Sequence, residues 1–122
     1  MRRDLNFELI DRRSLRTRVG GDLGLLREMI SIFTSEYPIM LDQLQQAIEL
    51  GDCSAVEKVS HKIKGSLVQF SALPAAETAR RLEEMGKHNS IDDSATVLES
   101  LKRELEELML VLNAVVSDGF TE

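Results

Sequence analysis

The sequence predicts an all-α protein, an up-and-down four-helix bundle with a short extra helix at its N-terminal end. Three observations predict this fold class. The 122 residues include only two prolines and are rich in Leu, Glu, Ala and Arg, which favour helices. Apolar residues recur at spacings of three and four along several segments, and no segment alternates with the period of two typical of a strand. We therefore expect one domain over residues 11–118, between a flexible leader at 1–10 and a tail at 119–122.

A short helix and a long one are expected first. Asp11 can cap the short helix, which should end near Val19 at the pair Gly20-Gly21. Asp22 can cap the long helix, which Pro38 interrupts. Because the apolar phase survives across this proline, we favour one kinked helix over two separate ones. The residues expected to face the core of the long helix are Leu26, Met29, Ile30, Phe33, Tyr37, Met40, Leu41, Leu44, Ala47 and Ile48.

Two shorter helices should follow. Gly51-Asp52 combines a helix stop with a cap, and the next helix should run from there to about Phe70. Pro74 suits the first turn of a further helix that reaches about Lys87, and Gly86–Ser90 is expected to be a loop. The apolar side of this helix is small enough for a neighbouring helix to approach closely: Ala75, Ala76, Ala79, Leu82 and Met85.

The last helix has the most regular pattern, and either Asp92 or Ser94 could cap it. Its apolar residues follow a 3-4-3-4-3 spacing: Leu98, Leu101, Leu105, Leu108, Leu112 and Val115. This spacing is typical of a helix that packs in a bundle, and a coiled-coil dimer is the alternative.

Composition argues against several classes of protein. The net charge of −6 disfavours a nucleic-acid partner. Six arginines in the first twenty residues are expected to lie on a solvated face. No apolar run approaches the roughly 18 residues of a membrane span, and no signal peptide opens the chain, so we expect no membrane contact. The single cysteine, Cys53, should be a half-buried helix residue, and the expected location is cytoplasmic.

The segment from Ser60 to Ser66 is the candidate functional site. On a helix with about 100° per residue, His61 lies roughly 160° from the centre of the apolar stripe, so its ring should point to solvent. Gly65 lies one turn further on the same face and leaves the approach to the ring open. Lys58, Lys62 and Lys64 add cations that suit a phosphoryl group or an acidic partner, although a histidine on a helix is more often an ordinary surface residue.

Residues 61–73, HKIKGSLVQFSAL, resemble the signature of histidine phosphotransfer (HPt) domains, in which lysine and glycine follow the histidine at the third and fourth positions. The resemblance covers roughly residues 15–87. Further matching positions are Gly21-Asp22, Leu25-Leu26, Phe33, Pro38, Leu50-Gly51-Asp52 and Leu82-Glu83.

The resemblance implies a phosphoryl carrier in a two-component His-Asp phosphorelay. His61 would accept a phosphoryl group on Nε2 from the phospho-aspartate of one receiver domain and pass it to another. Lys64 matches the lysine near the phosphoryl oxygens, and Gly65 matches the glycine that leaves room for the receiver. Glu83 matches the residue that often hydrogen-bonds the other ring nitrogen, although a plain surface carboxylate is an equal alternative. Receivers would be the partners and would bring Mg²⁺, and a hybrid sensor histidine kinase is a candidate upstream partner.

The sequence departs from the family pattern in two respects. Ser71 stands where the family commonly has glycine, so the turn could differ or the helix could continue, because serine is less comfortable at positive φ. Leu67 and Val68 are bulkier than the residues often found there. Leu67 joins the core stripe, whereas Val68 shares the face of the histidine and could contact the partner, as could Lys58 and Lys62.

Alternatives to this function come from other classes. No Gly-rich phosphate loop is present, so we expect a carrier without its own ATP site, cofactor or metal rather than an enzyme. A metal site could use Glu57 and His61 with His88, but the paired carboxylates and Glu-x-x-His spacing of bundle metal sites are missing. A non-catalytic helical adaptor, dimerising through the last helix, is the stronger alternative.

Overall fold

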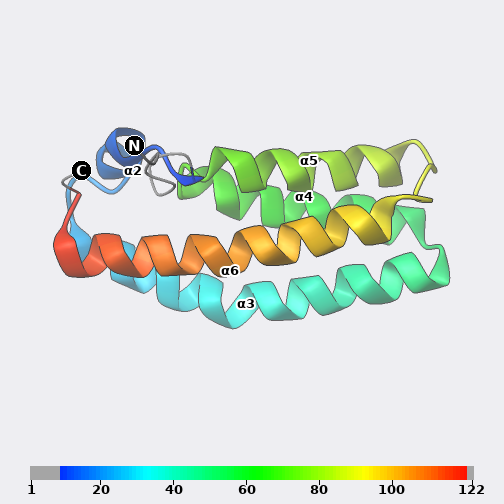
Figure 1. The fold of residues 1–122 in the computed structure, drawn as a ribbon, viewed down its shortest axis with the longest axis horizontal. Helices are drawn as coiled ribbons and strands as arrows, with labels where there is room; N and C mark the ends of the chain where they lie inside the picture. Colours follow the sequence, from blue (N-terminus) through cyan, green and yellow to red (C-terminus); the bar gives the residue numbers. More distant parts are fainter. Residues whose placement is uncertain (1–8, 121–122) are drawn as a thin grey trace, which may run out of the picture.

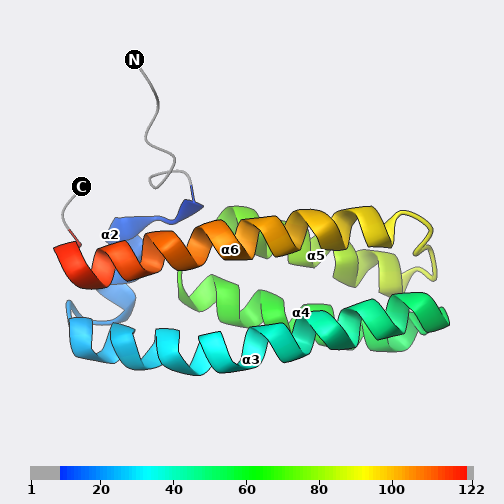
Figure 2. The ribbon, with the colours of Figure 1, turned by 60° about the horizontal axis from the view of Figure 1, so that its bottom comes forward.

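The structure is a computed structural model that describes residues 9–120, and over this range the chain is helical, with no strand. Helices α3, α4, α5 and α6 run up and down side by side as a bundle, as predicted (Figure 1). Both α3 and α6 extend past the shorter α4 and α5 at one end, where α2 lies (Figures 1 and 2). The helix bounds are α2 Arg12–Arg18, α3 Leu23–Leu50, α4 Cys53–Gln69, α5 Leu73–Lys87 and α6 Ser94–Asp118.

Aspartate side chains cap the first three of these helices. Asp11, Asp22 and Asp52 each accept a hydrogen bond from the backbone N–H three residues later, at 3.0, 3.0 and 3.1 Å. Each bond satisfies one of the N–H groups that a helix start leaves without a partner. Gly51 ends α3 in the left-handed conformation, with φ 69°. The predicted starts and stops of these helices are therefore confirmed.

The long helix α3 is unbroken from Leu23 to Leu50, and Pro38 lies within it. Its ribbon changes direction about halfway along (Figures 1 and 2), as expected for a helix that a proline interrupts. All ten residues predicted to face the core are buried or half-buried. The continuity of the apolar stripe was thus the correct guide to the continuity of the helix.

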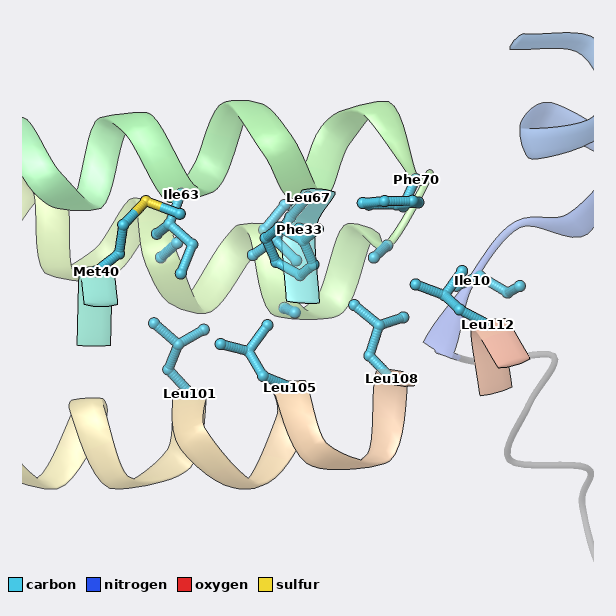
Figure 3. Packing of buried hydrophobic residues seen from close by; sticks show 14 of the residues in the cluster. Ile10, Phe33, Met40, Ile63, Leu67, Phe70, Leu101, Leu105, Leu108 and Leu112 are labelled. Atoms are coloured by element: carbon cyan, nitrogen blue, oxygen red, sulfur yellow. The ribbon is translucent and has the colours of Figure 1, made fainter. Parts of the chain in front are cut away.

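The leucine stripe of α6 packs inside the bundle. All six residues of the predicted stripe are buried. Figure 3 shows Leu101, Leu105 and Leu108 pointing from α6 toward the side of the bundle that holds Ile63 and Leu67. A coiled-coil dimer through these residues would require the bundle to open, so the bundle interpretation of their spacing holds.

The start of α6 and the end of α5 differ from the predictions. Asp93 is the N-cap residue of α6 and makes no capping hydrogen bond with its side chain, so neither Asp92 nor Ser94 is the cap. Ser94 is instead the first helical residue, and its buried hydroxyl donates to the backbone oxygen of Ile91. Gly86, expected in a loop, belongs to α5 and is buried.

Gly86 allows a close approach between α5 and α4. A Cβ added there would lie 2.6 Å from both Cys53 O and Glu57 N, which are backbone atoms in the first turns of α4. Backbone atoms cannot move aside as a flexible side chain can. The close approach that we predicted from the alanines of α5 therefore extends one turn further, to this glycine.

The turn after α4 keeps the backbone conformation that glycine would favour, although it contains Ser71. This residue has φ 55° and is only 2% exposed. Its hydroxyl donates to Ser14 Oγ at 2.8 Å, and its carbonyl oxygen accepts from Asp11 N at 3.0 Å. The helix does not continue through Ser71, and two hydrogen bonds attach the turn to the start of α2.

The ends of the packed domain lie slightly outside the predicted bounds. Ile10, which we placed in the leader, is 1% exposed and belongs to the core, and Leu9 is half-buried. Phe120, placed in the tail, also packs against the core. Arg12 is buried rather than solvated. Residues 1–8 and 121–122 of the predicted leader and tail lie outside the described residues.

Within residues 9–120, none of the helices combines the length and the apolar character that crossing a membrane requires.

Candidate functional site

His61 lies on the outer face of α4. The opposite face of this helix is buried, through Val56, Ser60, Ile63 and Leu67. The His61 side chain is 68% exposed, as the helical periodicity predicted. The ring is therefore accessible to a second protein while its helix is fixed by the core.

Glu83 on α5 holds one nitrogen of this ring. Its Oε2 lies 2.8 Å from His61 Nδ1, and the carboxylate is only 15% exposed. The two helices bring these residues together because alanines and Gly86 allow α5 to lie close against α4. The structure thus joins the histidine to the one residue on the next helix that the sequence singled out.

Lys64 binds the other oxygen of the same carboxylate, with Nζ 2.7 Å from Glu83 Oε1. Its side chain is 28% exposed. Sequence reasoning placed Lys64 near the ring but did not find this ion pair, because spacing on one helix does not show which residue of a neighbouring helix lies opposite.

The pair of contacts also determines the charge of Glu83. Burial is the largest single influence and raises the pKa of this carboxyl, but the contacts and charges of Lys64 and His61 together outweigh it, so its pKa lies below its ordinary value. Glu83 is therefore ionised at neutral pH and can only accept hydrogen bonds. It follows that His61 Nδ1 carries a proton, and that Nε2 is the nitrogen left for chemistry in the neutral ring.

Gly65 leaves open space beside the histidine. It is exposed, and a Cβ added there would have nothing within 4 Å. This distinguishes Gly65 from Gly86, where close packing explains the glycine. A hollow of about 370 Å³ lies on the α5 side of the ring and is lined by Glu57, Lys58, His61 and Glu83. Glu57, which we considered only as a metal ligand, is thus part of the surface around the site.

The predicted partner-contact residues are not equally accessible. Lys58 and Lys62 are exposed on α4. Val68 is half-buried and packs against the core, so only part of its side chain is available to a partner.

A groove between α3 and α4 was not found from the sequence. It has a volume of about 200 Å³ and is lined by Met29, Ile32, Phe33, Glu36, Ser66, Gln69 and Phe70. Ile32 is 59% exposed and lies outside the predicted core stripe of α3. The signal that could have found the groove is the seven-residue spacing of Leu25, Ile32 and Ile39 beside that stripe.

The second histidine contacts a glutamate through the other ring nitrogen. His88 lies at the end of α5, and its Nε2 is 3.1 Å from Glu84 Oε1. Glu57 and His61 do not form a metal site with it: among residues 9–120, no group of three or more His, Cys, Asp or Glu side chains could hold a metal ion. Cys53 is half-buried at the start of α4, as predicted.

Comparisons with known proteins agree with this geometry. The profile of the Hpt domain family matches residues 28–109, which include α4 and α5 whole. The crystal structure of histidine-containing phosphotransfer protein B (HptB) from Pseudomonas aeruginosa PAO1 has a similar fold, with a TM-score of 0.59. The similarity covers 79% of this chain and 93% of that chain, at 21% identity. No curated protein matches the sequence. The chain belongs to the Hpt domain family, whose members pass phosphoryl groups through a histidine in two-component phosphorelays.

Proposed function

We propose that His61 carries the phosphoryl group in this Hpt domain and that it does so on Nε2. The observation that supports this most directly is the contact between Glu83 Oε2 and His61 Nδ1 on a ring that is 68% exposed. The contact fixes the tautomer and the orientation of the ring, and leaves Nε2 as the nucleophile.

In the proposed step, the lone pair of Nε2 attacks the phosphorus of an aspartyl phosphate on a receiver domain. The P–N bond forms as the P–O bond breaks, and the receiver recovers its aspartate carboxylate. Since Nδ1 keeps its proton, the phosphorylated ring carries a positive charge, which the adjacent Glu83 carboxylate offsets. The reverse step passes the phosphoryl group to a second receiver.

The partner would supply what this chain does not. A receiver brings the aspartate, an acidic pocket and Mg²⁺, and Lys58 and Lys62 on the exposed face of α4 offer complementary charge. Gly65 leaves room for the receiver backbone. We also propose that this surface continues into the groove between α3 and α4, because Ser66 directly follows Gly65 and lines that groove.

The test is incubation with a phosphorylated receiver domain, with His88→Gln as a matched control. His61 and His88 are 68% and 67% exposed, and each contacts a glutamate of α5. Wild type and His88→Gln should acquire an acid-labile, base-stable phosphate, and His61→Gln should not. Phosphate on His61→Gln would show that another residue is the acceptor.

The same experiment addresses the adaptor alternative and the absence of an ATP site. A non-catalytic adaptor would acquire no phosphate in any variant. A carrier should acquire phosphate from the receiver and none from ATP alone. If a hybrid sensor histidine kinase is the upstream partner, its receiver domain should be a donor. The cytoplasmic location stays a prediction, which cell fractionation would test.

A further inference from the structure

Lys64 is not a free cation in the unphosphorylated protein. Its ammonium group lies 2.7 Å from Glu83 Oε1, and this oxygen belongs to the carboxylate that holds His61 Nδ1 through Oε2. The carboxylate is 15% exposed and the lysine 28%, so both groups are partly shielded from water. Because an ammonium group has three N–H donors, two arrangements are open to a lysine that binds a phosphoryl group on His61: it keeps this contact, or it gives the contact up.

Phosphorylation would change the balance of charge around Glu83. A protein-bound phosphoryl group adds about −1.5 to −2 charges and three strong acceptor oxygens. With Nδ1 still protonated, the phosphorylated ring carries a positive charge beside Glu83 Oε2, which offsets the negative charge of the carboxylate without Lys64. The strongest acceptor near Lys64 is then the phosphoryl group rather than the carboxylate.

We infer that Lys64 exchanges partners when His61 is phosphorylated, leaving Glu83 Oε1 for the phosphoryl oxygens and returning when the group is passed on. Glu83 thus has two opposed effects on the phosphorylated state. It stabilises the positively charged ring, and it competes with the phosphoryl group for the lysine. The competition limits how strongly the domain retains the phosphoryl group, which suits a carrier that must also release it. The inference rests on the proposed function of His61.

A double-mutant cycle separates the two effects of Glu83. The variants are Glu83→Gln, Lys64→Met and the pair, and the measured quantity is the equilibrium constant for phosphoryl exchange with one phosphorylated receiver. With Met at position 64, Glu83→Gln removes only the support of the ring and should lower the constant. With Lys64 present, the same substitution also releases the lysine, so the constant should fall less or rise.

The expected non-additivity is about two- to fivefold, the range for a partly exposed ion pair. A static Lys64–Glu83 pair, kept in both states, would give no non-additivity in the exchange constant although the pair still affected unfolding. That result would overturn the inference. Glu84→Gln, which removes only the contact with His88 on the same helix, is the control and should leave the exchange constant unchanged.

A second measurement follows the lysine directly in the wild-type protein. Phosphoramidate, a small phosphoryl donor, would be used in place of a receiver, and ¹⁵N NMR would record the ammonium group of Lys64. A shift that accompanies phosphorylation, and that vanishes in His61→Gln, supports partner exchange. Phosphorylation without a shift contradicts it. Failure of wild type to be phosphorylated even by the receiver would instead contradict the proposed function, so the two failures differ.

Discussion

Glu83 and His61 are separated by 22 residues in the chain, yet Glu83 Oε2 lies 2.8 Å from His61 Nδ1. The contact depends on the close approach of α5 to α4, since neither residue could position the other across a wider gap. Packing inside the bundle and the proposed chemistry on its surface are therefore linked at this carboxylate.

Glu83 should make the stability of the domain depend on acid pH. Its pKa is lower in the folded protein than its ordinary value of 4.5, which we take for the unfolded chain, so its contribution is present above that pKa. It is lost as the pH falls through the folded pKa. We expect Glu83→Gln to lower the free energy of unfolding by about 1 kcal/mol at pH 7 and by progressively less below about pH 4. Urea unfolding of both proteins from about pH 3 to pH 7, a range that includes the ordinary carboxyl pKa, would measure the difference in stability. A difference that stays constant down to the lowest pH would contradict it.

Gly65 should be replaceable without loss of stability but not without loss of transfer. It has an ordinary helical φ, and a side chain there would meet open space, so Gly65→Ala should stabilise the fold by about 0.5–1 kcal/mol. Gly65→Gln should keep the helix and place a long side chain where, in the proposed function, a receiver would approach. We expect its transfer rate to fall by about 10²-fold. Circular dichroism and a transfer assay would check both statements. Unchanged transfer in Gly65→Gln would contradict a role of this position in docking.

Gly86 should behave in the opposite way. An added Cβ would lie 2.6 Å from two backbone atoms of α4, and overpacking of this kind costs about 1–3 kcal/mol. The gain in helix propensity from Gly to Ala is only about 1 kcal/mol, so Gly86→Ala should be destabilising on balance. It should also weaken phosphoryl transfer, because it pushes α5 away from the helix that carries His61. Urea unfolding of Gly86→Ala and Gly65→Ala gives the matched comparison. Equal effects of the two substitutions on the free energy of unfolding would contradict this account of Gly86.

These two glycines also show how far the sequence could predict the structure. Periodicity correctly identified the long helices, and on α4 it gave the exposure of His61 and the open space at Gly65, because both depend on one helix alone. Gly86 looked like a loop residue because glycine usually disfavours helices. Its reason is the backbone of another helix, which a pattern along one segment does not contain.

The same distinction applies to the residues around His61. The position of Glu83 came from a family resemblance, and its partnership with Lys64 came from neither periodicity nor resemblance. The prediction of the N-cap residue of α6 was wrong for a different reason. Asp92, Asp93 and Ser94 are adjacent and all suit an N-cap, so composition could not choose among them. Burial of Ile10 was missed because the end of the chain has no repeating pattern to extend.

Substitutions of Ser71 should show whether its backbone conformation or its hydroxyl has the larger effect on the stability of the fold. The residue has φ 55°, a region that costs a side-chain-bearing residue about 1 kcal/mol or more, and its hydroxyl donates to Ser14 Oγ at 2.8 Å. Ser71→Ala loses the hydrogen bond and keeps the unfavourable φ, whereas Ser71→Gly loses the bond and relieves the backbone. We therefore expect the glycine variant to be more stable than the alanine variant by about 1 kcal/mol in urea unfolding.

Ser14→Ala provides the complementary measurement. It leaves the backbone of the turn unchanged but removes the acceptor of the Ser71 hydroxyl, which is in a residue only 2% exposed. A buried donor without a partner costs about 1–3 kcal/mol, so this variant should be destabilised even though Ser14 itself lies on α2. Equal stability of the Gly and Ala variants at position 71 would mean that the turn relaxes out of the left-handed region. No effect of Ser14→Ala would mean that the hydroxyl finds another acceptor, and α2 would then hold the turn only through the bond from Asp11 N to the carbonyl of Ser71.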